Sequence, residues 1–174
     1  NDDFLFSSGV HFIDINHKGS YAQNNEEAEY IKKLCAKLLT LNWKNKEGEV
    51  NEVTPKDIMI VSPFNAQVHL LKEKLPEINK IGTIDKFQGQ ESAVVIISYS
   101  SSSPENISES SGGKGAKFLF DYKRLNVAIS RAKVSSIVIL NKNLLDYPCS
   151  TIEEMKSLNY FCSLRSLYVE DSNI

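Results

Sequence analysis

Short, continuously apolar runs alternate with helical patterns along this chain, and this alternation constrains the fold more than any other feature. The runs at residues 58–64 and 93–100 are apolar at nearly every position, where a half-exposed strand would be apolar at every second one. Strands that are apolar on both sides belong to parallel sheets covered by helices on both faces. We therefore expect an α/β domain of three layers with a mainly parallel sheet.

The remaining segments fit the same architecture. Further strands are expected at 10–15, 80–85 and 135–140. Apolar residues at three- and four-residue spacing predict helices at 24–41, 65–76, 121–133 and 151–161. Asn24 or Asn25 can cap the first of these helices, and Thr151 with Glu154 can cap the last. The polar residues 43–57 are expected to form a loop, and so is the Ser/Gly-rich segment 101–115.

Bulk composition excludes some classes of protein. With 174 residues, 41% of them hydrophobic, and a net charge of −2, the chain fits one ordinary globular domain. No apolar run approaches the roughly 20 residues that span a bilayer, and the three cysteines match no metal or redox spacing. We expect no metal site, no membrane partner and an intracellular location. Because the chain does not begin with Met, we also expect it to be a fragment of a longer protein.

A phosphate-binding loop is missing from the sequence. The nearest candidate is "SGGKGAK" at 111–117, but Ser108 stands where the first glycine belongs and Gly115 follows Lys114. No acidic pair follows an apolar strand to hold magnesium. We therefore expect that the chain does not bind and hydrolyse a nucleotide by itself.

The segment "GTIDKFQGQES" at 82–92 leaves one strand and enters the next. Gly89 permits a sharp turn, Gln88 can donate and accept hydrogen bonds, and Glu91 can accept one from a ribose hydroxyl or an arginine. Thr83 offers a hydroxyl and an amide to a phosphate oxygen. A solvated polar turn explains the same residues.

The segment "RLNVAISRAK" at 124–133 carries Arg124 and Arg131 about 20° apart around a helix and about 10 Å apart along it. Residues 112–133 hold six cations and one acid, although the whole chain is acidic. Paired arginines suit phosphate oxygens, and Lys133 follows them as a third cation. A solvated face with salt bridges is the alternative.

The segment "SPFNAQV" at 62–68 ends a strand at Ser62-Pro63 and opens a helix at Asn65. Exposed amides at a helix N-terminus bind phosphate. An ordinary N-cap is the alternative interpretation.

Together, "IVSPFNAQV", "IGTIDKFQGQESAVVIIS" and "RLNVAISRAK" resemble motifs IV, V and VI of superfamily-one helicases, in the branch of the RNA-surveillance helicase and the replication nuclease-helicases. The resemblance spans about residues 58–140. It implies that the whole of 1–174 is the second RecA-like domain, with a P-loop NTPase-like fold, of a nucleic-acid-binding ATP hydrolase. ATP and Mg would be held mainly by the missing N-terminal RecA-like domain, and the other partner would be single-stranded DNA or RNA.

The resemblance also implies roles for individual residues. Arg131 would be an arginine finger, and Gln88 would couple the two ligand sites. Gly89 and Glu91 would line the nucleotide, and Arg124, like Lys133, would have a structural role. The nucleic-acid backbone would contact Ser62, Gln67 and Thr83. The glutamine and tyrosine-arginine elements that the family has upstream are absent from this chain.

Two other functions fit the same sequence. The chain could be a degenerate helicase fold kept as a protein-interaction module without ATPase activity. It could also be an unrelated doubly wound domain that binds a small molecule at its strand ends, in which case its strand order would differ from that of a RecA-like sheet.

Overall fold

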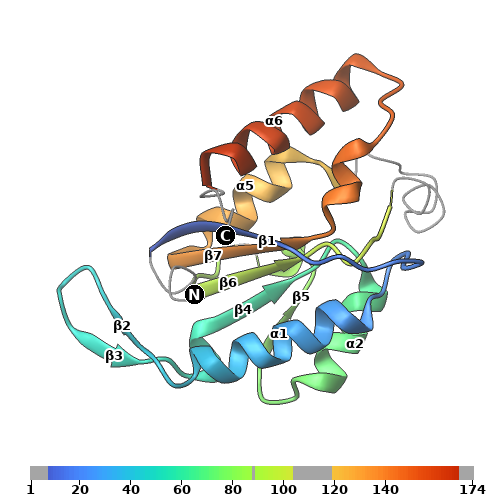
Figure 1. The fold of residues 1–174 in the computed structure, drawn as a ribbon. Helices are drawn as coiled ribbons and strands as arrows, with labels where there is room; N and C mark the ends of the chain where they lie inside the picture. The colour runs from blue at the N-terminus through green and yellow to red at the C-terminus, as the bar shows by residue number, and fades with distance from the viewer. Residues whose placement is uncertain (1–7, 88, 104–118, 169–174) are drawn as a thin grey trace, which may run out of the picture.

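A five-stranded parallel sheet forms the centre of the domain in the computed structural model, which describes residues 8–87, 89–103 and 119–168 (Figure 1). Its strands lie in the order β1-β7-β6-β4-β5, and every neighbouring pair is parallel. Their bounds are β1 Gly9–Asp14, β4 Ile58–Val61, β5 Lys80–Gly82, β6 Ser92–Ser98 and β7 Ala132–Leu140. The expected sheet is confirmed.

Helices cover both faces of this sheet and complete the three layers (Figure 1). Helices α1 (Asn25–Leu38) and α2 (Asn65–Lys74) cover one face, and α5 (Tyr122–Ser130) and α6 (Ile152–Tyr168) cover the other. Alternate residues of each strand enter the two cores: Ile60 and Ile96 pack under α1 and α2, whereas Val61 and Ile97 pack under α5 and α6. This double burial explains why the central strands are apolar at every position.

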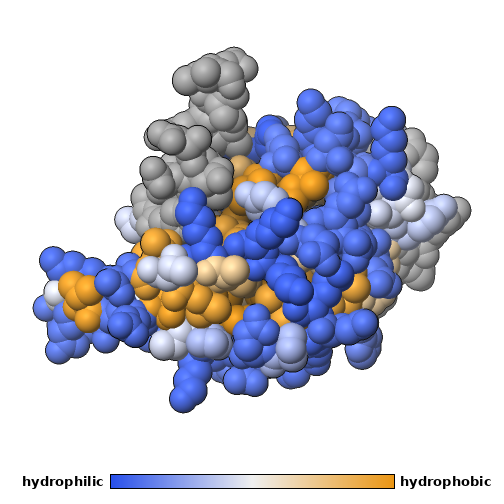
Figure 2. Space-filling model, turned by 60° about the horizontal axis from the view of Figure 1, so that its bottom comes forward, coloured by the Kyte–Doolittle hydropathy of each residue, from blue (hydrophilic) through white to orange (hydrophobic). Residues whose placement is uncertain are grey.

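The segment 43–57, expected to be a loop, instead contains a β-hairpin. Strands β2 (Asn42–Lys44) and β3 (Val50–Glu52) pair antiparallel, and Gly48 takes a positive φ of 87° in their turn. The strands are only three residues long and largely exposed, so they lack the alternation that marks a half-buried strand. The hairpin projects from the domain (Figure 1), and its Val50 is 67% exposed. Figure 2 shows patches of apolar residues among the hydrophilic residues of one face of the molecule.

Side-chain caps begin three of the four α-helices in the described part of the chain. The Asn24 side chain accepts from the Glu27 amide, the Asp121 side chain accepts from the Lys123 amide, and Glu154 and Thr151 form the expected reciprocal pair. Helix α2 differs, because Phe64 stands at its N-cap and makes no side-chain capping bond. The first amides of α2 therefore lack the usual side-chain acceptor.

Helix α5 is shorter than the predicted 121–133. It ends at Ser130, Arg131 is its C-cap, and Lys133 lies on β7 with an exposed side chain. Arg131 still has helical backbone dihedrals, with φ −79° and ψ −14°. Arg124 and Arg131 therefore lie on the same edge of the helix, as expected. Lys133 does not belong to that edge.

Candidate functional site

The carboxyl edge of the sheet, where β4, β5 and β6 end, contains a cavity of about 290 Å³. Segments 61–65 and 83–85 form one side of it, and α5 with the residues just before it forms the other. The lining side chains are Val61, Ser62, Pro63, Asn65, Thr83, Ile84, Asp85, Ile97, Tyr99, Leu119, Asp121, Arg124, Leu125 and Ala128. The structure therefore brings Ser62 and Thr83 together at one site.

Ser62 and Thr83 are held in place by the backbone. The Ser62 amide donates to the Gly82 carbonyl at 3.1 Å, so the ends of β4 and β5 stay side by side. The Ser62 hydroxyl accepts from the Phe64 amide at 3.3 Å, just before the uncapped start of α2. Two hydroxyls and the N-terminus of a helix thus meet at this edge, a combination suited to a phosphate oxygen.

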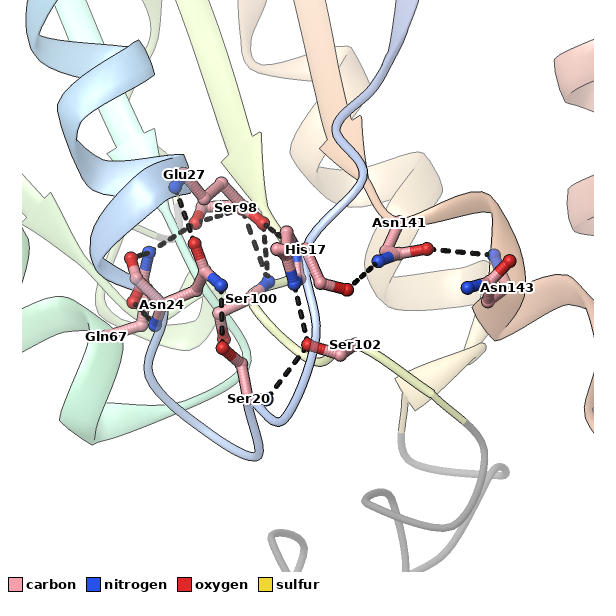
Figure 3. Close-up of polar contacts among 10 residues, drawn as sticks. All are labelled: His17, Ser20, Asn24, Glu27, Gln67, Ser98, Ser100, Ser102, Asn141 and Asn143. Carbon is pink, nitrogen blue, oxygen red and sulfur yellow. Dashed lines mark hydrogen bonds and ion pairs between the residues drawn. The ribbon is translucent and has the colours of Figure 1, made fainter.

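Gln67 does not join Ser62 and Thr83 at this surface. Its side chain is fully buried and hydrogen-bonds to the Asn24 amide at 2.8 Å and to the Ser98 hydroxyl at 3.0 Å (Figure 3). In this arrangement the amide holds α2 against α1 and β6, so we do not carry Gln67 forward as a contact for nucleic acid.

Gln67 belongs to a buried polar network that sequence reasoning missed (Figure 3). Its centre is the fully buried Glu27, which accepts from the Ser98 hydroxyl at 2.5 Å and from the Ser100 amide at 3.1 Å. The imidazole of His17 lies 3.4 Å from the same carboxylate, and its other nitrogen lies 2.7 Å from the Ser102 hydroxyl. The network joins the ends of β1 and β6 to α1.

The opposite, amino edge of the sheet carries a second group of residues, where β6 and β7 begin. The Ser92 amide donates to the Arg131 carbonyl at 3.0 Å, so Glu91 and Arg131 sit at the start of neighbouring strands. Lys80 donates to the Glu91 carbonyl at 3.0 Å and to the Ser92 hydroxyl at 2.9 Å. Lys80 therefore ties β5 to this edge, a role that its place in the sequence did not reveal.

The side chains at this edge remain open to a ligand. Glu91 is exposed, and within the described part of the chain the buried Nε of Arg131 has no hydrogen-bond partner. Gly89 has φ 77°, which confirms the expected sharp turn, and a Cβ added there would meet no described atom within 4 Å. Gln88 lies outside the described residues.

Two segments link the edges. The chain passes from Thr83 at the carboxyl edge to Glu91 at the amino edge, and helix α5 packs against the 3-10 turn Ile84–Phe87. The nine residues of α5, Tyr122–Ser130, span about 13 Å. Arg124 joins them: its guanidinium lies 3.5 Å from the Asp85 carboxylate and 3.7 Å from that of Asp121. Arg124 therefore links the segment that follows β5 to the start of α5.

Two observations describe the chemical character of the site. Burial, assisted by Asp121, raises the pKa of the Tyr99 phenol, so the wall that it forms in the cavity is neutral at physiological pH. In the described ranges, no cluster of three His, Cys, Asp or Glu side chains could hold a metal ion. Across the same ranges, no helix has the length and apolarity needed to span a bilayer.

Comparison with known proteins agrees with this geometry. Residues 7–143 match the family model described as "AAA domain". The chain is 34% identical over 125 residues to an ATP-dependent helicase of Methanocaldococcus jannaschii, covering 70% of this chain and 15% of the relative. It is 34% identical over 99 residues to RNA helicase Mov10l1 of Mus musculus, covering 55% and 8%. It is 36% identical over 90 residues to DNA replication ATP-dependent helicase/nuclease DNA2 of Gallus gallus, covering 49% and 8%.

The fold and site define a RecA-like α/β domain. The chain belongs to the AAA domain family, in its helicase-type form, and the resemblance to superfamily-one helicases is confirmed. The chain spans between 8% and 15% of the length of these three curated relatives.

Proposed function

We propose that residues 1–174 form the second motor domain of an ATP-dependent helicase, which acts together with an upstream RecA-like domain on single-stranded nucleic acid. One observation carries the proposal. The residues suited to a nucleotide lie at the amino edge of the sheet, those suited to a nucleic-acid backbone lie at the carboxyl edge, and one loop and one helix connect them.

At the amino edge, Arg131 acts on the terminal phosphate of ATP held by the upstream domain. Its place at the end of α5, next to the start of β6, supports a group presented at this edge of the sheet. An arginine placed in this way stabilises the charge that develops in the transition state, a contribution of about 10³-fold or more in rate. Glu91 accepts a hydrogen bond from the ribose, and Gly89 lets the backbone approach the nucleotide.

ATP is the substrate, and the Mg that accompanies it neutralises phosphate charge. Both are held mainly by the upstream domain. The described residues of this chain supply no carboxylate cluster for the metal. This domain instead contributes Arg131 to the phosphate, Glu91 to the ribose and the turn at Gly89 to the nucleotide.

At the carboxyl edge, Ser62, Thr83 and the uncapped start of α2 bind phosphates of the strand. Contacts to backbone phosphates by themselves read no base sequence. Arg124, held between Asp85 and Asp121, transmits the state of this edge along α5. Gln88 couples the two ligand sites.

The test is Arg131→Ala in a protein that joins the chain to its upstream motor domain. Turnover of ATP at saturating single-stranded nucleic acid should fall by about 10³-fold. Lys133→Ala is the matched control: it removes the same charge two residues away, from an exposed position on β7, and should leave turnover within a few-fold of wild type. If Arg131→Ala behaves like the control, the arginine finger is refuted.

A second test uses the isolated chain. It should show negligible ATP turnover and weak, salt-sensitive binding to single strands, because phosphate contacts release counterions. Robust turnover by residues 1–174 alone would contradict the division of labour between two domains.

A further inference from the structure

The cavity at the carboxyl edge extends behind the residues that we assign to backbone phosphates. Its inner wall is apolar and buried, with Val61, Ile97, Leu125 and Ala128 each no more than 4% exposed. Its mouth is charged: the side chains of Asp85, Asp121 and Arg124 are between 34% and 59% exposed. The hydroxyls of Ser62 and Thr83, which suit a phosphate, therefore adjoin an apolar cavity that suits an uncharged group.

We propose that this cavity receives one unstacked nucleobase of the bound strand. The inference rests on the proposed function, because the base is attached to the backbone held at Ser62 and Thr83. It goes beyond that function by assigning a base-binding site to a domain whose contacts were otherwise to backbone alone.

Charge at the mouth argues against a phosphate inside the cavity. Two carboxylates, Asp85 and Asp121, face one guanidinium, Arg124, so this part of the lining disfavours an anion, in contrast to the hydroxyls of Ser62 and Thr83. A neutral group with hydrogen-bond donors is favoured instead. Nucleobases have such donors on their edges and apolar faces that pack against aliphatic or aromatic walls.

The volume of the cavity also favours a single base. At about 290 Å³ the cavity lies at the lower end of pockets that hold small molecules, so it fits one ring system and excludes a whole nucleotide or a folded peptide segment. The inner wall offers aliphatic surface from two elements, Ile97 on β6 and Leu125 on α5, between which a flat ring can lie.

The carboxylates also predict which bases bind best. Arg124 lies 3.5 Å from Asp85 and 3.7 Å from Asp121, longer than a direct charge-assisted hydrogen bond of about 2.7–2.9 Å, so both acids can still accept from a ligand. Carboxylates accept from the exocyclic amine of cytosine. Uracil has a carbonyl at the same position and would face the carboxylates with another acceptor.

The first measurement uses the 174-residue chain and a short single-stranded oligonucleotide containing one 2-aminopurine. This base fluoresces weakly when stacked in a strand, and its emission should rise when the chain binds and the base enters the cavity. Ala128→Met fills the cavity from α5 and should remove the rise, and it should weaken binding measured by anisotropy about five-fold or more, the loss of one base contact. Ala36→Met, which places the same side chain on the exposed face of α1, is the control.

The second measurement needs no variant, so it holds even if Ala128→Met fails to fold. Oligonucleotides of cytidine and of uridine, in ribo and deoxyribo form, are compared by anisotropy on the unaltered chain. Cytidine strands should bind about five-fold or more tightly, because cytosine presents its exocyclic amine to the carboxylates where uracil presents a carbonyl. Asp85→Asn should reduce that ratio.

The outcomes separate the two proposals. If strands bind but cytidine and uridine bind equally and 2-aminopurine does not brighten, the base site is refuted and the backbone contacts stand. If no strand binds to the unaltered chain, the proposed function fails together with this inference.

Discussion

Replacing the buried Glu27 by alanine is the sharpest test of how the fold is held together. Glu27 lies in the first turn of α1 with no exposed surface, and its carboxylate accepts from the Ser98 hydroxyl and the Ser100 amide. His17 lies 3.4 Å away on the other side. Ser100 depends on these contacts, because it holds a positive φ of 54°, an uncommon conformation for a residue with a side chain.

The expected cost follows from the groups left without a partner. Glu27→Ala leaves the Ser98 hydroxyl, the Ser100 amide and the His17 imidazole in a buried space without the carboxylate. A buried donor without an acceptor costs about 1–3 kcal/mol, and the substitution leaves two such donors, the Ser98 hydroxyl and the Ser100 amide. We expect a loss of about 3–5 kcal/mol in the free energy of unfolding, or about 6–20 °C in Tm for a domain of this size.

Urea and thermal unfolding followed by circular dichroism measure this loss. The matched control is Glu26→Ala, the exposed neighbour in the same helical turn, which loses only its interaction with the helix dipole, about 0.3–1 kcal/mol. Equal effects of the two substitutions would refute the claim that Glu27 organises the carboxyl end of β6.

Three other substitutions or probes give independent checks. Gly82→Ala should cost about 1–3 kcal/mol in urea unfolding, because the new Cβ would lie 3.1 Å from the Phe87 ring and 2.9 Å from Lys86 Cδ. Burial raises the pKa of the Cys35 thiol from 9.0 to about 12, so Cys35 should resist alkylation at pH 8 until the chain is unfolded in urea. Because the folded pKa is the higher one, the stability linked to this thiol should be complete below pH 9 and fall as pH rises toward 12. Arg124→Gln should cost less than about 1 kcal/mol, since its ion pairs are part-exposed. In the protein joined to its upstream domain, Arg124→Gln should nevertheless reduce nucleic-acid stimulation of ATP turnover several-fold, and an unchanged stimulation would exclude Arg124 from the coupling.

The sheet and its helices could be predicted from the sequence because a strand that is buried on both faces is apolar at every position. Residues such as Ile96 and Ile97 point to opposite cores, so the strand reads as one apolar run. Caps were equally visible, since Asn24 and Thr151 stand just before amphipathic segments. The β2–β3 hairpin left no such trace, because its strands are only three residues long and largely exposed.

The site could be predicted only in part, because its geometry depends on contacts between distant segments. In the sequence Glu27 is simply one of two acids in the first turn of α1, and its polar partners His17 and Ser98 come from other segments. Gln67 stood beside residues of a family motif, yet its amide turns inward. The separation of Thr83 from Arg131 follows from topology, since α5 runs opposite to the strands and delivers its C-terminus to the amino edge.

The central claim is that nucleotide and nucleic acid are served by opposite edges of one sheet. The most direct measurement is the ATP turnover of the joined protein, titrated with single-stranded nucleic acid, for Thr83→Ala and Arg131→Ala. Thr83→Ala should raise the half-saturating nucleic-acid concentration about ten-fold, the loss of one hydrogen bond to a charged group, with turnover largely recovered at saturation. Arg131→Ala should lower saturated turnover by about 10³-fold without raising the half-saturating concentration. If the two substitutions change the same parameter in the same way, the two edges do not have separate roles.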